Sequence, residues 1–212
     1  MKKMLFCLLF VFFPNLSSIA SPNKIPEFLR SMSGCFEVNY QYVEDDPLGR
    51  PTRAVEFKSI EWMEVKEEQG KFLLENQMLR EKKKEFFSHF GQIWSLTSES
   101  DKEGYSKWKV VGLGPNEENR EVRSECQGFL KSSADKQFRF TCEATKAAKP
   151  RRDTGLPYEY VNRIHRYLFG DAGFHDTQEN KKFTKKDELY AKEIGWNRYK
   201  RIEEKLCQEY LE

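Results

Sequence analysis

Apolar and polar residues alternate along most of the chain after residue 32. In the first such segment, apolar or aromatic side chains occupy every second position, at Phe36, Val38, Tyr40 and Tyr42, and polar residues stand between them. A period of two is typical of a β-strand that buries one face. The Pro, Gly and Asp residues of the following segment, 45–51, predict a loop.

Seven further segments have strand-like patterns and are separated by turn signals. They cover residues 54–65, 72–79, 86–96, 105–113, 121–131, 137–144 and 158–169. In the first of these the phase slips, because Phe57 and Ile60 have opposite parity, and a β-bulge near Lys58 or Ser59 would reconcile the two halves. Many short strands joined by turns predict a mainly β fold, either a single antiparallel lipocalin-like barrel or a sandwich.

The pattern changes toward the C-terminus. Residues 174–180 are polar and predict a loop, and apolar residues recur at helical spacing in 185–194 and again in 201–211, with Gly195 between them. We therefore expect C-terminal helices from about residue 185. A barrel of this size either holds one small ligand or is filled by its own side chains, and the pattern favours neither.

The first twenty residues have the three parts of a secretory signal peptide. Lys2 and Lys3 precede an apolar run over 4–13, and small residues lead up to Ala20. The run is too short to span a bilayer, which takes roughly 20 apolar residues. The sequence thus predicts a leader over 1–20, a single folded domain over 21–212, and export to the periplasm or the extracellular space.

The charge balance bears on the partners. The chain has 36 basic and 34 acidic residues, and loss of Lys2 and Lys3 with the leader leaves 34 of each. Nucleic acids and anionic membranes require a clustered basic excess, so we expect neither as the main partner. No second long apolar segment follows the leader, and we expect no membrane span in the mature chain.

Four cysteines remain after the leader, at Cys35, Cys126, Cys142 and Cys207. In an oxidising compartment they allow two disulfides in three connectivities. No C-x-x-C pair is present, which argues against a zinc site. Charged residues separate Cys35 from the apolar run of the leader, which argues against a lipid-modified cysteine.

One hairpin register would bring two of the cysteines together. If the turn is centred on Ala134, then Cys126 and Cys142 are directly opposed, and the same register pairs Gly128 with Phe140 and Leu130 with Phe138. We predict a disulfide in this hairpin and, by elimination, a second one between Cys35 and Cys207. Two buried free thiols in the hairpin are the alternative.

Few residues have the spacing of a known catalytic or metal site. Of the three histidines, His89 lies in a strand, where a hydrogen-bonded structural role is the simpler interpretation, and His175 lies in the predicted polar loop. The H-E-x-x-H spacing, the G-x-S-x-G elbow and a glycine-rich phosphate loop are all missing. We therefore assign no catalytic residue and expect no metal or cofactor.

A pair of arginines, Arg151 and Arg152, follows Pro150. Adjacent residues of a strand point to opposite faces, so at most one of the two can face the interior. An inward arginine could hold a carboxylate or phosphate of a ligand. An ion pair with a neighbouring acid such as Asp153 or Glu159 is the alternative.

Several motifs together resemble an uncharacterised family of exported bacterial proteins, a domain of unknown function. Its His-Trp-Arg-Gln-Asp-Trp strand is matched at His89, Gln92 and Trp94, while Phe90, Gly91 and Ile93 depart from it. The other similar segments are 33–38, 150–153 for a Pro-Arg-Arg-Glu element, the Asn162–Arg163 pair, 173–181 for a Gly-Trp-His-Glu-Gln-Asp-Asn-Lys segment, and 195–199 followed by Cys207. The resemblance implies export and a strand-rich fold, and it implies no reaction.

The leading hypothesis is an exported β-barrel protein that binds a small apolar or carboxylate-bearing ligand or an envelope partner. The candidate ligand-binding residues are His89, Gln92, Trp94, Arg151, Arg152, Asn162, Arg163 and His175. One alternative is an enzyme with His89, Arg152 and His175 at the barrel mouth. Another is a structural envelope protein with a filled core.

The leader generates the first testable prediction. Because Ala20 ends the small-residue stretch after the apolar run, the exported protein is expected to begin at Ser21. N-terminal sequencing and intact-mass measurement of exported material check this. An intact leader, or an acyl group on Cys35, would contradict it.

Overall fold

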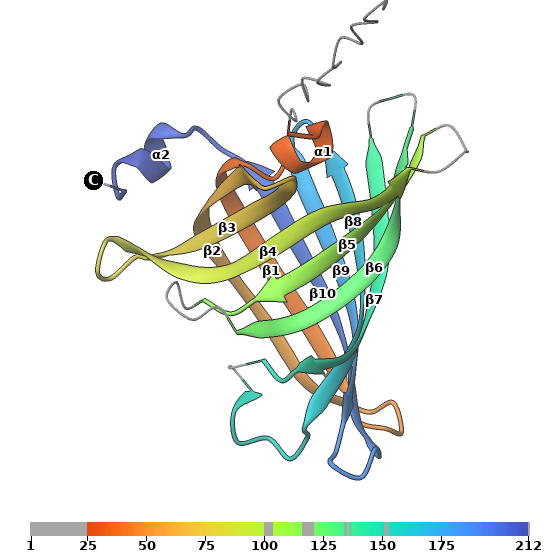
Figure 1. The fold of residues 1–212 in the computed structure, drawn as a ribbon. Helices are drawn as coiled ribbons and strands as arrows, with labels where there is room; N and C mark the ends of the chain where they lie inside the picture. The colour runs from red at the N-terminus through yellow and green to blue at the C-terminus, as the bar shows by residue number, and fades with distance from the viewer. Residues whose placement is uncertain are drawn as a thin grey trace, which may run out of the picture.

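The strands of the chain form a closed antiparallel barrel. The computed structural model describes residues 25–99, 104–115, 121–133, 135, 137–150 and 153–211. Within them, ten strands are hydrogen-bonded in the order β1-β10-β9-β8-β7-β6-β5-β4-β3-β2, so that every strand is paired on both sides (Figure 1). The predicted antiparallel barrel is therefore confirmed, and the sandwich is not observed. The signal-peptide segment lies outside the described residues.

Two short helices flank the strands, α1 (Glu27–Arg30) before β1 and α2 (Lys205–Gln208) after β10. The strands are β1 (Gly34–Asp45), β2 (Pro51–Glu68), β3 (Lys71–Arg80), β4 (Glu85–Glu99), β5 (Tyr105–Leu113), β6 (Val122–Ser132), β7 (Phe138–Ala148), β8 (Tyr160–Gly170), β9 (Gly173–Phe183) and β10 (Leu189–Arg201). The described residues contain no helix long and apolar enough to cross a membrane.

Pairing of the first and last strands closes the barrel. β1 and β10 are antiparallel in continuous register from Phe36 opposite Arg201 to Asp45 opposite Lys192. β1 is paired on its other side with β2, from Gly34 opposite Met63 onward. Closure leaves no unpaired strand edge, which removes the usual site of edge-to-edge association.

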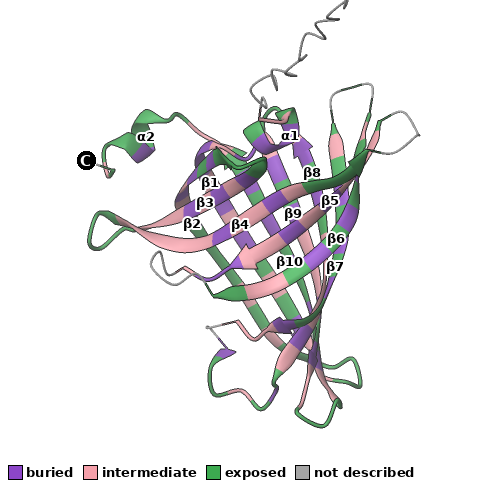
Figure 2. Ribbon diagram, viewed as in Figure 1, coloured by how far each residue is buried: buried purple, intermediate pink, exposed green. Residues whose placement is uncertain are grey.

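The helix α1 closes one end of the barrel. Phe28 and Leu29 of this helix are buried, and the ring of Phe28 lies 5.6 Å from that of Trp94, 5.1 Å from that of Trp108 and 5.5 Å from that of Phe169. These rings come from β4, β5 and β8, so a four-residue helix contacts strands on different sides of the barrel. The hairpins at the opposite end are exposed (Figure 2).

The expected C-terminal helical segment is confirmed only as the short helix α2, and the helix predicted over 185–194 and the polar loop before it are wrong. Residues 173–183 form β9 and residues 189–201 form β10, and only Lys205–Gln208 are α-helical after them. In β10 the buried inward positions include Glu193 and Asn197, whereas Ile194 and Trp196 are exposed on the outside. The alternation of a strand is present, but at these positions the polar residues face the interior and the apolar residues face solvent. The hydrophobic pattern of the sequence therefore did not indicate a strand.

Gly195 belongs to this strand and does not separate two helices. A Cβ at this position would lie 2.6 Å from the ring of Tyr42, the residue opposite it in β1. Glycine therefore allows the Tyr42 ring to lie across β10 inside the barrel.

The bulge expected near Lys58 or Ser59 is also absent. β1 and β2 stay in register past these residues, and the irregularity of this pair lies at Glu44 and Asp45. The inward face of β2 includes the buried Ser59 and Glu61. Polar residues in the interior produced the apparent change of phase.

The structure contains both predicted disulfides, Cys126–Cys142 and Cys35–Cys207. The predicted hairpin register is wrong by two residues, because Cys142 lies opposite Gly128 and Cys126 lies opposite Ala144. Cys126 and Cys142 are therefore diagonal neighbours, with a Cα–Cα distance of 5.6 Å. A Cβ on Gly128 would lie 1.9 Å from the Thr141 carbonyl oxygen, so this close approach requires glycine.

The second disulfide connects β1 to the C-terminal helix. Cys35 is the second residue of β1 and Cys207 is the buried residue of α2, and their Cα atoms are 5.8 Å apart. The Ile202 amide donates a hydrogen bond to the Cys35 carbonyl oxygen on the same side of the barrel. The disulfide thus holds a helix of four residues that could not be stable alone.

The closure by α1 generates a prediction. Phe28→Ala removes a buried ring that contacts rings of β4, β5, β7 and β8 and leaves a cavity, so the free energy of unfolding should fall by about 3–5 kcal/mol. Urea denaturation followed by tryptophan fluorescence measures the loss. Phe129→Ala is the matched control, since Phe129 is 57% exposed, and its effect should stay within about 0.5 kcal/mol. Equal losses in the two variants would refute the role given to α1.

Candidate functional site

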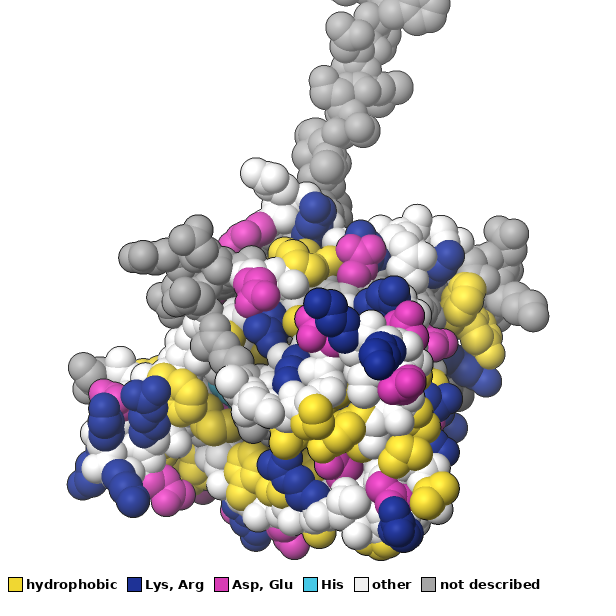
Figure 3. Space-filling view, turned by 90° about the horizontal axis from the view of Figure 1, so that it is seen from below, with side chains coloured by type: hydrophobic (Ala, Val, Ile, Leu, Met, Phe, Trp, Pro, Cys, Tyr) yellow, Lys and Arg dark blue, Asp and Glu magenta, His cyan; other side chains and the backbone are white. Residues whose placement is uncertain are grey.

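A cavity of about 650 Å³ occupies the barrel interior below α1. It extends from Met32, next to α1, to Arg80 and Ala148 at the far ends of β3 and β7. Residues of β1, β4, β5, β6, β8, β9 and β10 also line it. Figure 3 views the molecule from the far end, where acidic and basic side chains are interspersed. The volume of the cavity is within the range of small-molecule sites, about 300–1,000 Å³.

One wall of the cavity is aromatic. Tyr42 from β1 and Phe87 and Phe90 from β4 are half-buried and line it, and the buried Phe174 from β9 contributes farther in. Such rings offer apolar contact area with little loss of side-chain freedom. This wall suits the apolar part of a ligand.

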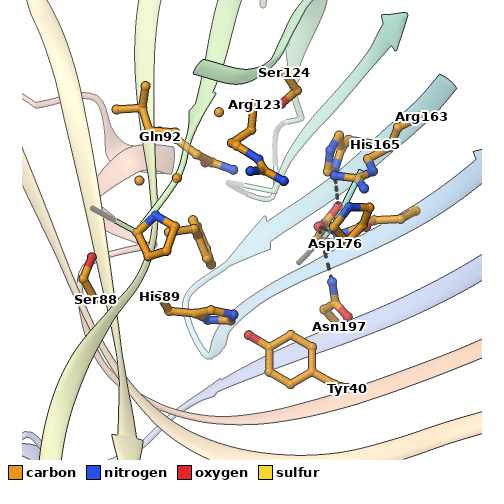
Figure 4. Close-up of a pocket in the computed structure, with 18 of the residues that line it drawn as sticks. Tyr40, Ser88, His89, Gln92, Arg123, Ser124, Arg163, His165, Asp176 and Asn197 are labelled. Carbon is orange, nitrogen blue, oxygen red and sulfur yellow. Dashed lines mark hydrogen bonds and ion pairs between the residues drawn. The ribbon is translucent and has the colours of Figure 1, made fainter. Parts of the chain in front are cut away.

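β8, β9 and β10 carry polar side chains that line the cavity beside these rings. The His165 Nδ1 atom lies 3.0 Å from the Oδ1 atom of Asp176, and the Gln178 amide donates a 2.6 Å hydrogen bond to Asp176 Oδ2. The Asn197 amide also donates to Asp176 Oδ2, at 3.5 Å. Figure 4 shows His165 and Asn197 on either side of the Asp176 carboxylate. Three strands thus contribute to one hydrogen-bonded cluster.

A second carboxylate lies behind the cavity surface. Glu61 of β2 is fully buried and accepts hydrogen bonds from the Tyr40 hydroxyl at 2.6 Å, the Ser59 hydroxyl at 2.8 Å and the Asn76 amide at 2.6 Å. Burial raises the pKa of Tyr40 well above its usual value, and the charges of Tyr199 and Glu61 add to this. Tyr40 is therefore a neutral donor to Glu61 across the physiological pH range.

His89 reaches the interior through a β-bulge. Asn76 lies opposite Phe90 and Gln77 lies opposite Ser88, so that His89 has no partner residue in β3. An extra residue in one strand re-aims its side chain, and Figure 4 shows His89 directed toward Tyr40. His89 therefore lines the cavity together with Phe90 and Gln92, although simple alternation places them on opposite faces.

The expected hydrogen-bonded structural role of His89 is not observed. Its buried Nδ1 atom has no hydrogen-bond partner among the described residues and lies 3.8 Å from Glu61 Oε1. Burial lowers the pKa of His89, and the nearby Glu61 charge opposes this only in part. The imidazole is thus neutral at neutral pH.

A bulge also places Arg123, which the sequence did not indicate as a site residue. Gly112 lies opposite Ser124 and Leu113 lies opposite Val122, so that Arg123 is the extra residue of β6. Its guanidinium donates hydrogen bonds to the rim residue Glu121, at 3.0 Å, and to the Lys149 carbonyl oxygen. Figure 4 shows its end group in the cavity. Strand alternation alone would place this arginine on the outer face.

Buried charges close the part of the interior next to the far hairpins. The Lys182 ammonium of β9 donates to Glu44 of β1, to Asp153 at 2.9 Å and to Glu193 of β10 at 3.1 Å. Asp153 also accepts from Arg53 at 3.1 Å. Burial alone would lower the pKa of Lys182, but the three carboxylates together outweigh it and raise the pKa. Lys182 therefore stays charged and connects β1, β9 and β10 to the segment after β7.

Four of the predicted ligand-binding residues belong to the cavity or its support. His89, Gln92 and Arg163 line the cavity. Trp94 is fully buried below α1, and its indole N–H donates to the Gln92 side-chain oxygen at 2.9 Å, while Gln92 donates to the Tyr167 hydroxyl at 3.1 Å. Trp94 thus orients a residue of the site.

Of the remaining candidates, His175 and Asn162 do not line the cavity. His175 lies in β9 with an exposed side chain, between the inward-facing Phe174 and Asp176. The Asn162 Oδ1 atom accepts a hydrogen bond from the Lys146 amide, at an irregularity of β7. Arg151 and Arg152 lie outside the described residues. A site that joins His89 and His175 is therefore wrong for this fold.

The described part of the chain contains no group of three or more His, Cys, Asp or Glu side chains arranged to hold a metal ion. Comparison of the chain with protein families, with curated proteins and with solved structures finds no match. The resemblance to a family of exported proteins therefore stays a prediction.

The Lys182 cluster generates a prediction with a neighbouring control. Lys182→Met leaves the three carboxylates without their shared cation, so the free energy of unfolding should fall by about 3–5 kcal/mol. Lys181→Met removes the same charge from the adjacent exposed position and should change stability by less than about 0.5 kcal/mol. Urea denaturation of both variants measures the difference. A Lys182→Met protein as stable as Lys181→Met would refute the cluster's role.

Proposed function

We propose that this protein is an exported carrier or sensor that binds a small organic molecule inside the barrel. The observation that carries the proposal is the open cavity itself, about 650 Å³ in volume, which is lined by both aromatic rings and polar side chains. An apolar pocket with a few convergent polar groups is the usual form of a ligand site. A filled core, as in a structural envelope protein, would leave no such space.

Two buried polar atoms of the lining residues support a ligand that is partly polar. The His89 Nδ1 and Asn197 Oδ1 atoms have no hydrogen-bond partner among the described residues. A buried polar atom without a partner costs about 1–3 kcal/mol. Both atoms are shielded from the cavity in this structure, so a ligand recovers part of this free energy only if the side chain turns toward it.

The two disulfides support the exported part of the proposal. Disulfides persist in oxidising compartments and are rare in the reducing cytosol. The two bonds link β6 to β7 and β1 to α2, and together with the predicted leader they favour the periplasm or the extracellular space.

A second candidate function is catalysis on the bound molecule, and the pair His165–Asp176 favours it. The carboxylate holds the imidazole by its Nδ1 atom at 3.0 Å, an arrangement that orients a histidine for proton transfer through Nε2. In that case Asp176→Asn would abolish turnover of the ligand while leaving its binding measurable. If Asp176→Asn and the wild type leave the bound molecule equally unchanged, the carrier function holds.

Filling the cavity tests the proposed function. Ser124 lies on the inner face of β6 and lines the cavity, so Ser124→Trp should fill part of it and abolish ligand retention. Gln127→Trp adds the same side chain to the exposed face of the same strand and should retain the ligand. The measurement is native mass spectrometry of each protein purified from its exporting cells, followed by extraction of any bound molecule.

The expected result is a small molecule on the wild type and on Gln127→Trp, but not on Ser124→Trp. Wild-type protein that carries no molecule and binds no aromatic probe would refute the proposal. A molecule equally abundant on Ser124→Trp would show that binding occurs elsewhere.

A further inference from the structure

The described cavity lining contains three arginines, Arg80, Arg123 and Arg163, and one carboxylate, Asp176. Two of the arginines have carboxylate partners outside the lining, since Arg80 pairs with Glu85 at 3.2 Å and Arg123 pairs with Glu121 at 3.0 Å. Glu61 is not in contact with the cavity and is already held by three donors.

Arg163 is the least compensated of these cations. It projects from β8 into the cavity (Figure 4), and its Nε atom donates a 2.6 Å hydrogen bond to the neutral side-chain oxygen of Asn180. Within the described residues no carboxylate lies in ion-pair contact with it. A guanidinium has five N–H donors, so its terminal nitrogens can still bind an anion in a bidentate manner.

Arg123 approaches the cavity from β6, and its position is fixed independently of a ligand. The bulge directs it inward, and the bonds to Glu121 and to the Lys149 carbonyl oxygen occupy only part of its guanidinium. Its side chain is 22% exposed, whereas that of Glu121 is 61% exposed. Solvent therefore screens the compensating carboxylate more than it screens the arginine.

The one carboxylate of the described lining, Asp176, is bonded to side chains other than Arg163. His165, Gln178 and Asn197 all donate to the Asp176 carboxylate and occupy both of its oxygens. Asp176 keeps its negative charge, but its oxygens are engaged by these three side chains and not by Arg163.

We propose that the ligand is a small organic anion, with a carboxylate or phosphate group held by Arg163 and Arg123 and an aromatic or apolar body against Phe87, Phe90 and Tyr42. This inference rests on the proposed function, since it names the ligand class of the same cavity. Charge-assisted bonds to a planar anionic group suit arginine, and the aromatic wall suits the remainder of the molecule.

Two fluorescent probes with the same aromatic body separate the charge from the apolar contact. Anilinonaphthalenesulfonate carries an anionic group, and phenylnaphthylamine lacks it. Wild-type protein should bind both, and the anionic probe more tightly by about tenfold, the worth of one charge-assisted hydrogen bond. Fluorescence titration, repeated by calorimetry, gives the two dissociation constants.

The variants assign the difference to named residues. Arg163→Gln should lower the affinity for the anionic probe by on the order of tenfold or more and leave the affinity for the neutral probe unchanged. Arg123→Gln should change the two affinities in the same direction. Arg166→Gln is the matched control, since Arg166 lies on the exposed face of the same strand and pairs with Glu179. Retained binding of the neutral probe shows that each variant is folded.

Competition then separates the two sources of negative charge. Benzoate, phenyl phosphate and benzyl alcohol have similar bodies and differ in their polar group. Displacement of the anionic probe by benzoate or by phenyl phosphate, but not by benzyl alcohol, supports the proposal, and the stronger competitor identifies the carboxylate or the phosphate.

Equal affinity for both probes, with no effect of Arg163→Gln or Arg123→Gln, would overturn the anion proposal and leave the proposed function intact. Failure of the wild type to bind either probe would instead contradict the proposed function itself.

Discussion

Closure of ten strands through the β1–β10 pairing is the constraint on which the rest of the structure depends. About eight strands give a barrel whose interior side chains can just fill, and diameter grows with strand number. A ten-stranded barrel therefore has more interior than its side chains occupy. Here one end is filled by α1 and the rings around Phe28, the other by the Lys182 cluster, and the cavity remains between them.

The polar interior makes this closure specific. A buried ion cluster such as Lys182 with its carboxylates contributes little net stability over an apolar equivalent, because desolvation offsets the attraction. Each of these groups nevertheless has its partner on another strand, so a shift in register would leave charges unpaired. The inward-facing Glu44, Glu61, Asp176, Lys182 and Glu193 thus act against alternative registers.

Two β-bulges turn the barrel wall into a site. In a regular strand His89 and Arg123 would face away from the interior, and the bulges in β4 and β6 bring both into the cavity opposite the hydrogen-bonded wall of β8, β9 and β10. Bulges are common beside binding sites because they re-aim single side chains while the strand pairing continues on either side. The bulge in β6 thus supplies Arg123 to the site, whereas Arg163 of β8 lines the cavity from a strand in regular register with β9.

The sequence by itself determined the architecture wherever apolar residues face inward, as in Phe36, Val38 and Tyr40, and it determined which cysteines form disulfides. It failed for β9 and β10, where Glu193 and Asn197 face inward and Trp196 faces water, because hydrophobic periodicity assumes an apolar interior. Only the tertiary structure decided the hairpin register, the bulges at His89 and Arg123, and the meeting of Lys182 with Asp153 from a distant loop. These features depend on barrel closure, which joins residues far apart in the chain and leaves no periodic signal in the sequence around each of them.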